Sequence, residues 1–104
     1  MKKKTLEEQK ASYIEELNEL KQRLELAKQS IPQAEEQIRK LKHLQNSSNT
    51  HERLEYVSAE LDLAMINNDI VNTNSLILLV SRRLELVEQK IQAEASESKF
   101  GLGE

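Results

Sequence analysis

The side chains that could take part in acid–base chemistry occur as neighbouring carboxylates. They are Glu7-Glu8, Glu15-Glu16 and Glu35-Glu36. All three pairs lie in charged stretches that are typical of a solvated helix surface rather than of a catalytic pair. The chain has no Gly-rich phosphate loop, no His-Glu-x-x-His motif and no nucleophile beside its base. We therefore expect a protein that is not an enzyme, with no catalytic residues and no cofactor.

The two histidines are the only candidate metal ligands beyond the carboxylates. His43 and His51 flank a polar segment, and the chain contains no Cys. Two imidazoles without acidic or Cys companions make a weak metal site. Solvated histidines beside a loop are the favoured interpretation, and we expect no metal.

Two basic clusters give an alternative function. Lys2-Lys3-Lys4 stands at the N-terminus, and Arg82 and Arg83 follow Ser81. Together they are compatible with a small nucleic-acid-associated regulator, whose attraction to a probe would be weak and salt-sensitive. The net charge of −3 argues against this function, because nucleic-acid binders usually carry a basic face.

The elements that carry these residues are predicted by heptad spacing. Apolar residues recur every seven positions from Tyr56 to Ile91, and a second series follows three residues after each, from Ala59. This pattern is typical of the a and d positions of a coiled coil. It predicts a helix over about 51–95, and a similar series predicts an earlier helix over about 4–45. Charged residues make up 32% of the chain and aromatic residues 3%, which suits long helices better than a compact core.

Proline interrupts the first helix and polar residues end it. Pro32 predicts a kink, because it lacks an N–H and its ring clashes with the preceding turn. A full break, with Ser30 as the N-cap and Gln33 after it, stays an alternative. The loop over 46–50 is rich in Asn and Ser, and Asn49 or Thr50 is expected to cap the second helix.

A short loop between helices of nearly equal length predicts an antiparallel hairpin over residues 1–95. The two heptad series then oppose each other in one register, centred between Ser48 and Asn49. That register places Leu20 opposite Ile77 and Leu17 opposite Val80. The fold class is therefore all-α, an antiparallel coiled coil that assembles into a four-helix bundle or a larger helical complex.

The second helix carries a further apolar stripe that points away from the first. Its residues are Val57, Leu61, Ala64, Met65, Val71, Leu78, Leu79 and Leu86. A helix that is apolar on two sides requires a partner on each side. We expect this stripe to be the partner interface, used either in a two-fold homodimer or in docking onto a different helical protein.

Polar residues interrupt the middle of this stripe. Asn67, Asn68, Asn72 and Asn74 surround Thr73, which occupies a core position. Three interpretations stay open: a weak wetted helix, a polar layer that sets register and partner specificity, and a break into two helices between Asn67 and Ser75. The tail over 96–104 is predicted to be flexible, with Phe100 as a candidate anchor in a partner.

The remaining features concern location and role. The absence of Cys and of an N-terminal apolar segment suits a cytoplasmic protein, and the longest apolar run of five residues predicts no membrane span. We expect a non-enzymatic protein–protein interaction module, acting as a scaffold, adaptor or assembly chaperone. The outline resembles small helical-hairpin chaperones, phage assembly factors and subunits of cytoskeletal or tethering complexes, a likeness of shape without a shared motif.

Overall fold

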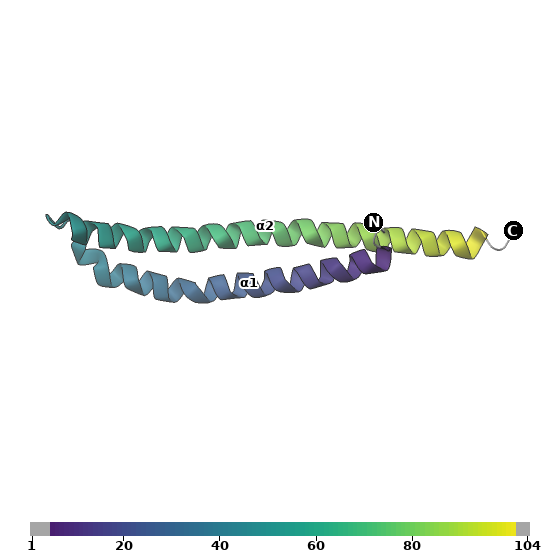
Figure 1. Cartoon of the computed structure of the whole chain (residues 1–104), viewed down its shortest axis with the longest axis horizontal. Helices are drawn as coiled ribbons and strands as arrows, with labels where there is room; N and C mark the ends of the chain where they lie inside the picture. The colour runs from purple at the N-terminus through teal and green to yellow at the C-terminus, as the bar shows by residue number, and fades with distance from the viewer. Residues whose placement is uncertain (1–4, 102–104) are drawn as a thin grey trace. The chain divides into compact units, whose positions relative to one another are not determined.

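A computed structural model describes residues 5–101, with side chains described for residues 5–96, and it contains two long helices (Figure 1). Helix α1 spans Leu6–Leu41, the 3₁₀ turn η1 spans Lys42–Leu44, and helix α2 spans Thr50–Gly101. No strand occurs within residues 5–101. The predicted all-helical hairpin is confirmed.

Helix α1 begins at a capping residue and continues through its proline. Thr5 Oγ1 accepts a hydrogen bond from the Glu8 amide at 3.1 Å, which satisfies one of the free N–H groups of the first turn. Pro32 lies inside the helix without interrupting it, so the alternative of a break at Ser30 is wrong. Ser30 Oγ instead donates to the Leu26 carbonyl at 3.0 Å, a side-chain bond that commonly accompanies a bent helix.

The turn between the helices is held by polar side chains. Asn49 Oδ1 accepts from the His51 amide at 2.9 Å, so Asn49 is the N-cap of α2, as predicted. Ser47 Oγ accepts from the Asn49 amide at 3.1 Å and lies 3.3 Å from Glu52 Oε2. The first helix ends earlier than the predicted residue 45, because its last residues tighten into η1.

Helix α2 is uninterrupted from Thr50 to Gly101. The alternative of a break between Asn67 and Ser75 is therefore wrong. The low helix propensity of Asn costs only tenths of a kcal/mol per residue, and the packing of the helical segments before and after it outweighs that cost. The helix also passes the predicted end at residue 95. The segment after Ala95 contains Glu and Lys, which favour helix, and no proline. Residues 102–104 lie outside the described part of the chain.

The chain divides into two compact units. The terminal unit combines Thr5 and residues 6–21 of α1 with residues 75–101 of α2, and the hairpin unit contains Gln22–Asn74. In the terminal unit Leu17, Leu20 and Val80 form the buried core, with Tyr13, Ile77 and Leu84 packed against it. This cluster confirms the predicted register, because Leu20 and Ile77 were expected to oppose each other.

The hairpin unit has a thinner interior. Tyr56 and Ala59 are its buried apolar residues, with Thr73 as its buried polar one. Burial raises the pKa of the Tyr56 phenol, and the charge and hydrogen bonding of the Glu60 carboxylate raise it further. The interior is thin because Ala27, Ala34 and Ala59 occupy heptad core positions where larger side chains would fill the space.

Candidate protein-interaction surface

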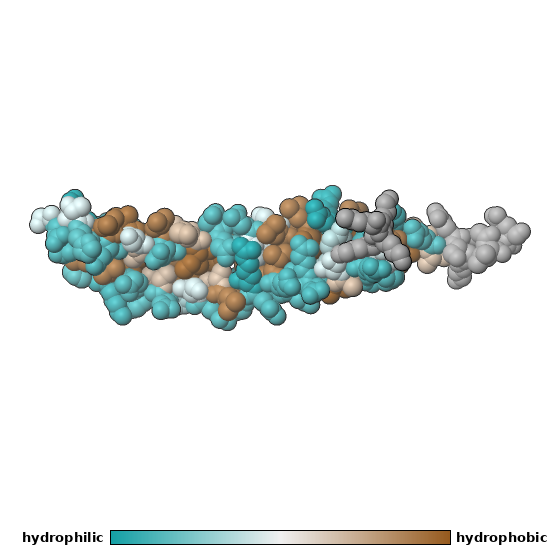
Figure 2. Space-filling model, in the orientation of Figure 1, coloured by the Kyte–Doolittle hydropathy of each residue, from teal (hydrophilic) through white to brown (hydrophobic). Residues whose placement is uncertain are grey.

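The outer face of α2 is apolar in the hairpin unit. Val57, Leu61, Met65 and Val71 are each more than half exposed, and Ala64 is exposed among them. Leu54 belongs to the same face at 59% exposure, and sequence reasoning missed it. Leu54 could have been predicted from the sequence, because it lies seven residues before Leu61 and so occupies the same heptad position. We call the set Leu54, Val57, Leu61, Ala64, Met65 and Val71 the hairpin patch, and Figure 2 shows brown apolar surface over this first part of α2.

The outer face of α2 is also apolar in the terminal unit. Leu78, Leu79 and Leu86 are more than half exposed, with Leu78 reaching 72%. These three residues form the terminal patch. A shallow hollow of about 430 Å³ beside them is lined by Leu78, Leu86, Ser81, Arg82 and Glu85. All eight residues of the predicted stripe thus lie at the surface of their unit.

The four asparagines lie outside the interior of the hairpin unit. Asn67, Asn68, Asn72 and Asn74 are all exposed. By heptad position Asn68 and Asn72 fall on the outer face of α2, beside the hairpin patch, and Asn67 and Asn74 on its side. A specificity role for these amides therefore concerns a partner on the outer face and not the pairing of α1 with α2.

Thr73 is the polar residue that does enter the interior. It is fully buried, and its Oγ1 has no hydrogen-bond partner among the described protein atoms. A buried hydroxyl without a partner costs about 1–3 kcal/mol relative to an apolar group of the same shape. The residue therefore lowers the stability of the hairpin unit.

Thr73→Val is expected to raise the free energy of unfolding by about 1 kcal/mol, because it replaces the unpaired hydroxyl with a methyl group of similar size. Urea unfolding followed by circular dichroism measures the change. Thr73→Ser is the matched control, since it keeps the hydroxyl and removes the methyl group, and it should destabilise. A destabilised valine variant would mean that the hydroxyl has a partner.

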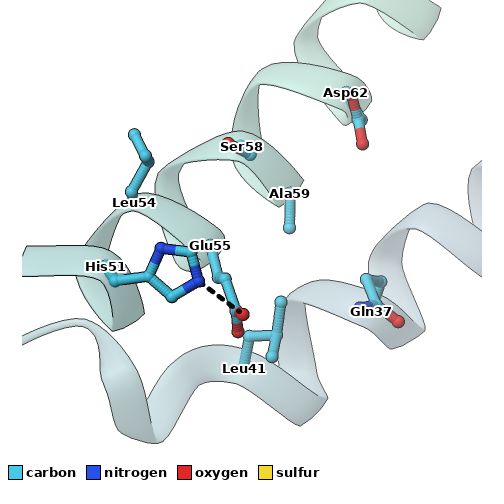
Figure 3. Close-up of a pocket in the computed structure, with 8 residues that line it drawn as sticks. All are labelled: Gln37, Leu41, His51, Leu54, Glu55, Ser58, Ala59 and Asp62. Atoms are coloured by element: carbon cyan, nitrogen blue, oxygen red, sulfur yellow. Dashed lines mark ion pairs between the residues drawn. The ribbon is translucent and has the colours of Figure 1, made fainter.

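A groove runs between α1 and α2 in the hairpin unit. It consists of three neighbouring hollows of about 490, 640 and 410 Å³ that share lining residues. Ala59 and Leu41 line its first part, where His51 Nε2 lies 3.7 Å from Glu55 Oε1 (Figure 3). Met65 lines the other two parts and also belongs to the hairpin patch. The groove therefore adjoins the apolar patch.

One ion pair joins α1 to α2 in this unit, and another lies within α1. Arg23 Nη2 donates to Asp69 Oδ1 at 2.7 Å across the groove. The sequence feature that could have predicted this ion pair is the heptad position beside the core, which both residues occupy. Arg39 bonds Glu36 on the surface of α1, which lowers the pKa of Glu36 and raises that of Arg39. Both pairs are exposed, so each contributes at most ~1 kcal/mol.

The remaining candidates are scattered. Lys2, Lys3 and Lys4 and the side chain of Phe100 lie outside the described residues. Arg82 and Arg83 are exposed, and neither forms an ion pair within residues 5–96. The described side chains contain no group of three or more His, Cys, Asp or Glu residues that could hold a metal ion. His43 and His51 are both exposed at the turn.

By length and average hydropathy one helix of the described chain, α2 within Thr50–Ser96, is apolar enough to cross a membrane. The core helices of soluble proteins meet the same criterion but are mostly buried, whereas this stretch is 11% buried by the described residues. The stretch from Leu63 to Val80 also contains Asp69 and four asparagines, and a single Asp near the bilayer centre costs about 2.5–3.5 kcal/mol.

No protein family, curated protein or solved structure matches this chain.

Proposed function

We propose that this protein is a non-enzymatic protein–protein interaction module that docks a helical partner on the outer face of α2. The supporting observation is the exposure of eight large apolar side chains on one face of a helix whose opposite face already packs against α1. Soluble proteins rarely leave contiguous apolar surface of this kind uncovered. Burial of such a face is worth roughly 25 cal/mol per Å² before the costs of association are subtracted.

A helical partner suits this face better than a peptide strand or a small molecule. In the hairpin patch Leu54, Val57, Leu61 and Ala64 follow one another at intervals of three, four and three, which is the spacing of a helix-in-groove or helix-on-helix contact. No strand occurs within residues 5–101, so no sheet edge there offers strand pairing. A scaffold, adaptor or assembly chaperone acts through contacts of this type.

The double variant Leu61→Asp with Leu79→Asp tests the proposal. We expect it to keep its helical circular dichroism, because both positions point away from α1, and to lose association completely. Light scattering of the purified chain, and of the chain with whatever co-purifies from the native source, measures the mass. Gln22→Asp with Gln29→Asp, two exposed positions on the outer side of α1, is the matched control. An unchanged mass for the Leu variant would refute the proposal.

A further inference from the structure

We propose that the groove between α1 and α2 in the hairpin unit binds an amphipathic helix of a partner protein, and that a basic side chain of this helix pairs with Asp62. This inference rests on the proposed function and names the chemistry of the partner. It also adds α1 to the contact, because one side of the groove belongs to α1. Every residue used for it lies within Gln22–Asn74, which form one compact unit.

The groove is continuous along the hairpin unit. Asp62 lines both its first and its second hollow, and Met65 lines both its second and its third. On α1 the lining residues extend from Arg23 to Leu41, which is about 27 Å at the helical rise of 1.5 Å per residue. A helix of about 18 residues has this length, so one partner helix can lie along the whole groove.

Apolar side chains from both helices line the groove. Leu26 of α1 is 65% exposed and Met65 of α2 is 61% exposed, and both line the third hollow. Leu54, which is also more than half exposed, lines the first hollow. Ala27 and Ala34 line the groove between these ends, and their short side chains allow a third helix to approach closely. The groove therefore suits the apolar side of a helix.

Leu26 is the residue that brings α1 into the contact. It is the exposed large apolar side chain within residues 22–41, where the other large apolar residues are at least partly buried. A single exposed leucine is common on protein surfaces. Leu26 is not isolated, however, because it shares the third hollow with Met65 of the opposite helix. A helix in the groove would cover both side chains at once.

The carboxylate of Asp62 determines the charge of the partner. Asp62 lines the middle of the groove, is exposed, and forms no ion pair within residues 5–96. The α1 residue that lines the same two hollows is Gln37, which is neutral. A Lys or Arg on a helix in the groove would pair with Asp62, whereas an acidic side chain there would be repelled. Complementary charge of this kind fixes orientation and excludes wrong partners.

The other charged residues that line the groove also favour a basic helix. Asp69 is already bound to Arg23 at 2.7 Å, so this pair adds no net charge. Glu55 Oε1 lies 3.7 Å from His51 Nε2, and this His is charged only when it is protonated. The residues that line the three hollows thus include three carboxylates and one Arg, which leaves the groove negative.

Two synthetic helical peptides of about 18 residues serve as probes. Both have Leu and Ala on one face, and they differ in the flanking positions, which are Lys in the basic peptide and Glu in the acidic peptide. The natural full chain should bind the basic peptide at least about tenfold more tightly than the acidic one. Fluorescence anisotropy of the labelled peptides measures both dissociation constants. Absence of saturable binding, or equal affinity for the two peptides, overturns the proposal.

Charge reversal tests the role of Asp62. Asp62→Lys should weaken binding of the basic peptide by about fivefold or more and strengthen binding of the acidic one. Glu25→Lys is the matched control, because it makes the same change of charge at an exposed α1 position that does not line the groove. Equal effects of the two variants would mean that the peptide responds only to net charge, and they overturn the pairing with Asp62.

Truncation of leucines tests the position of the helix. Leu26→Ala should weaken binding of the basic peptide by about tenfold, because a partner helix would bury this side chain. Leu61→Ala is the control, since Leu61 is equally exposed but lies on the outer face of α2 and does not line the groove. Weakening by Leu61→Ala and not by Leu26→Ala would place the helix on the outer face. That result overturns the groove as the site and leaves the proposed function standing.

Sedimentation equilibrium of the 12.0 kDa chain identifies a different occupant of the groove. A natural chain that dimerises, with the dimer lost in Leu26→Ala, would mean that a second copy fills the groove, and it overturns a basic partner. Circular dichroism checks that each variant keeps its helicity. The proposed function fails separately, when the Leu61 and Leu79 double variant loses no partner of any kind.

Discussion

Leu20→Ala lowers the free energy of unfolding by about 3 kcal/mol, the expected cost of removing most of a leucine side chain from a packed site. Leu20 is 9% exposed and lies in the core of the terminal unit with Leu17 and Val80. The core of that unit is small, so its neighbours contribute few other apolar contacts that could close the cavity. Urea unfolding followed by circular dichroism at 222 nm measures the loss.

Leu26→Ala is the matched control for this variant. Leu26 stands on the same helix and is 65% exposed, so its truncation should change stability by less than about 0.5 kcal/mol. Equal losses at Leu20 and Leu26 would contradict the register, since the two positions differ in the structure mainly by burial. If the chain associates, both variants are compared at one protein concentration, because association adds to apparent stability.

Pro32→Ala is expected to raise the free energy of unfolding by about 2–3 kcal/mol. Proline in a helix interior removes the bond to the carbonyl four residues earlier, which belongs to Lys28, and is about 3 kcal/mol less favourable than alanine. Pro32 is exposed, so the substitution removes little packing. A rise in melting temperature, followed by circular dichroism, measures the effect.

The neighbouring residue provides the control for the proline variant. Gln33 is also exposed on α1, and Gln33→Ala should gain only a few tenths of a kcal/mol from helix propensity. A Pro32→Ala chain that is no more stable than the natural one would mean that the local backbone geometry at Pro32 is needed for packing. Ile31 and Ala34, both partly buried on the inner side of α1, would then be the residues affected.

The pairing of the helices could be predicted because it depends on a single repeating pattern. Tyr13, Leu17 and Leu20 occur at intervals of four and three, and the same spacing recurs at Ile77, Val80 and Leu84. That spacing alone identifies the residues that face each other in an antiparallel coiled coil. The cap at Asn49 was equally local, since an Asn before a helical pattern accepts from the first free amides.

Other features depend on energies that the pattern does not contain. The sequence favoured an end of the second helix near residue 95 because Ser and Gly follow, yet the cost of Ser within a helix is small and the helix continues to Gly101. Predicting the ion pair between Arg23 and Asp69 requires the positions of the two residues along the helix axes, and not only their heptad positions. The heptad periodicity does not identify a partner, because an apolar stripe indicates only a surface that is suited to burial.

The thin interior described above has a consequence for the stability of the chain when no partner is bound. Only six apolar side chains are buried among the described residues. With so few contacts to break, local opening of either helix should require little free energy, and peptide bonds within it become accessible to proteases. If the proposed partner binds the outer face of α2, the bound chain is expected to resist proteolysis for longer than the free chain.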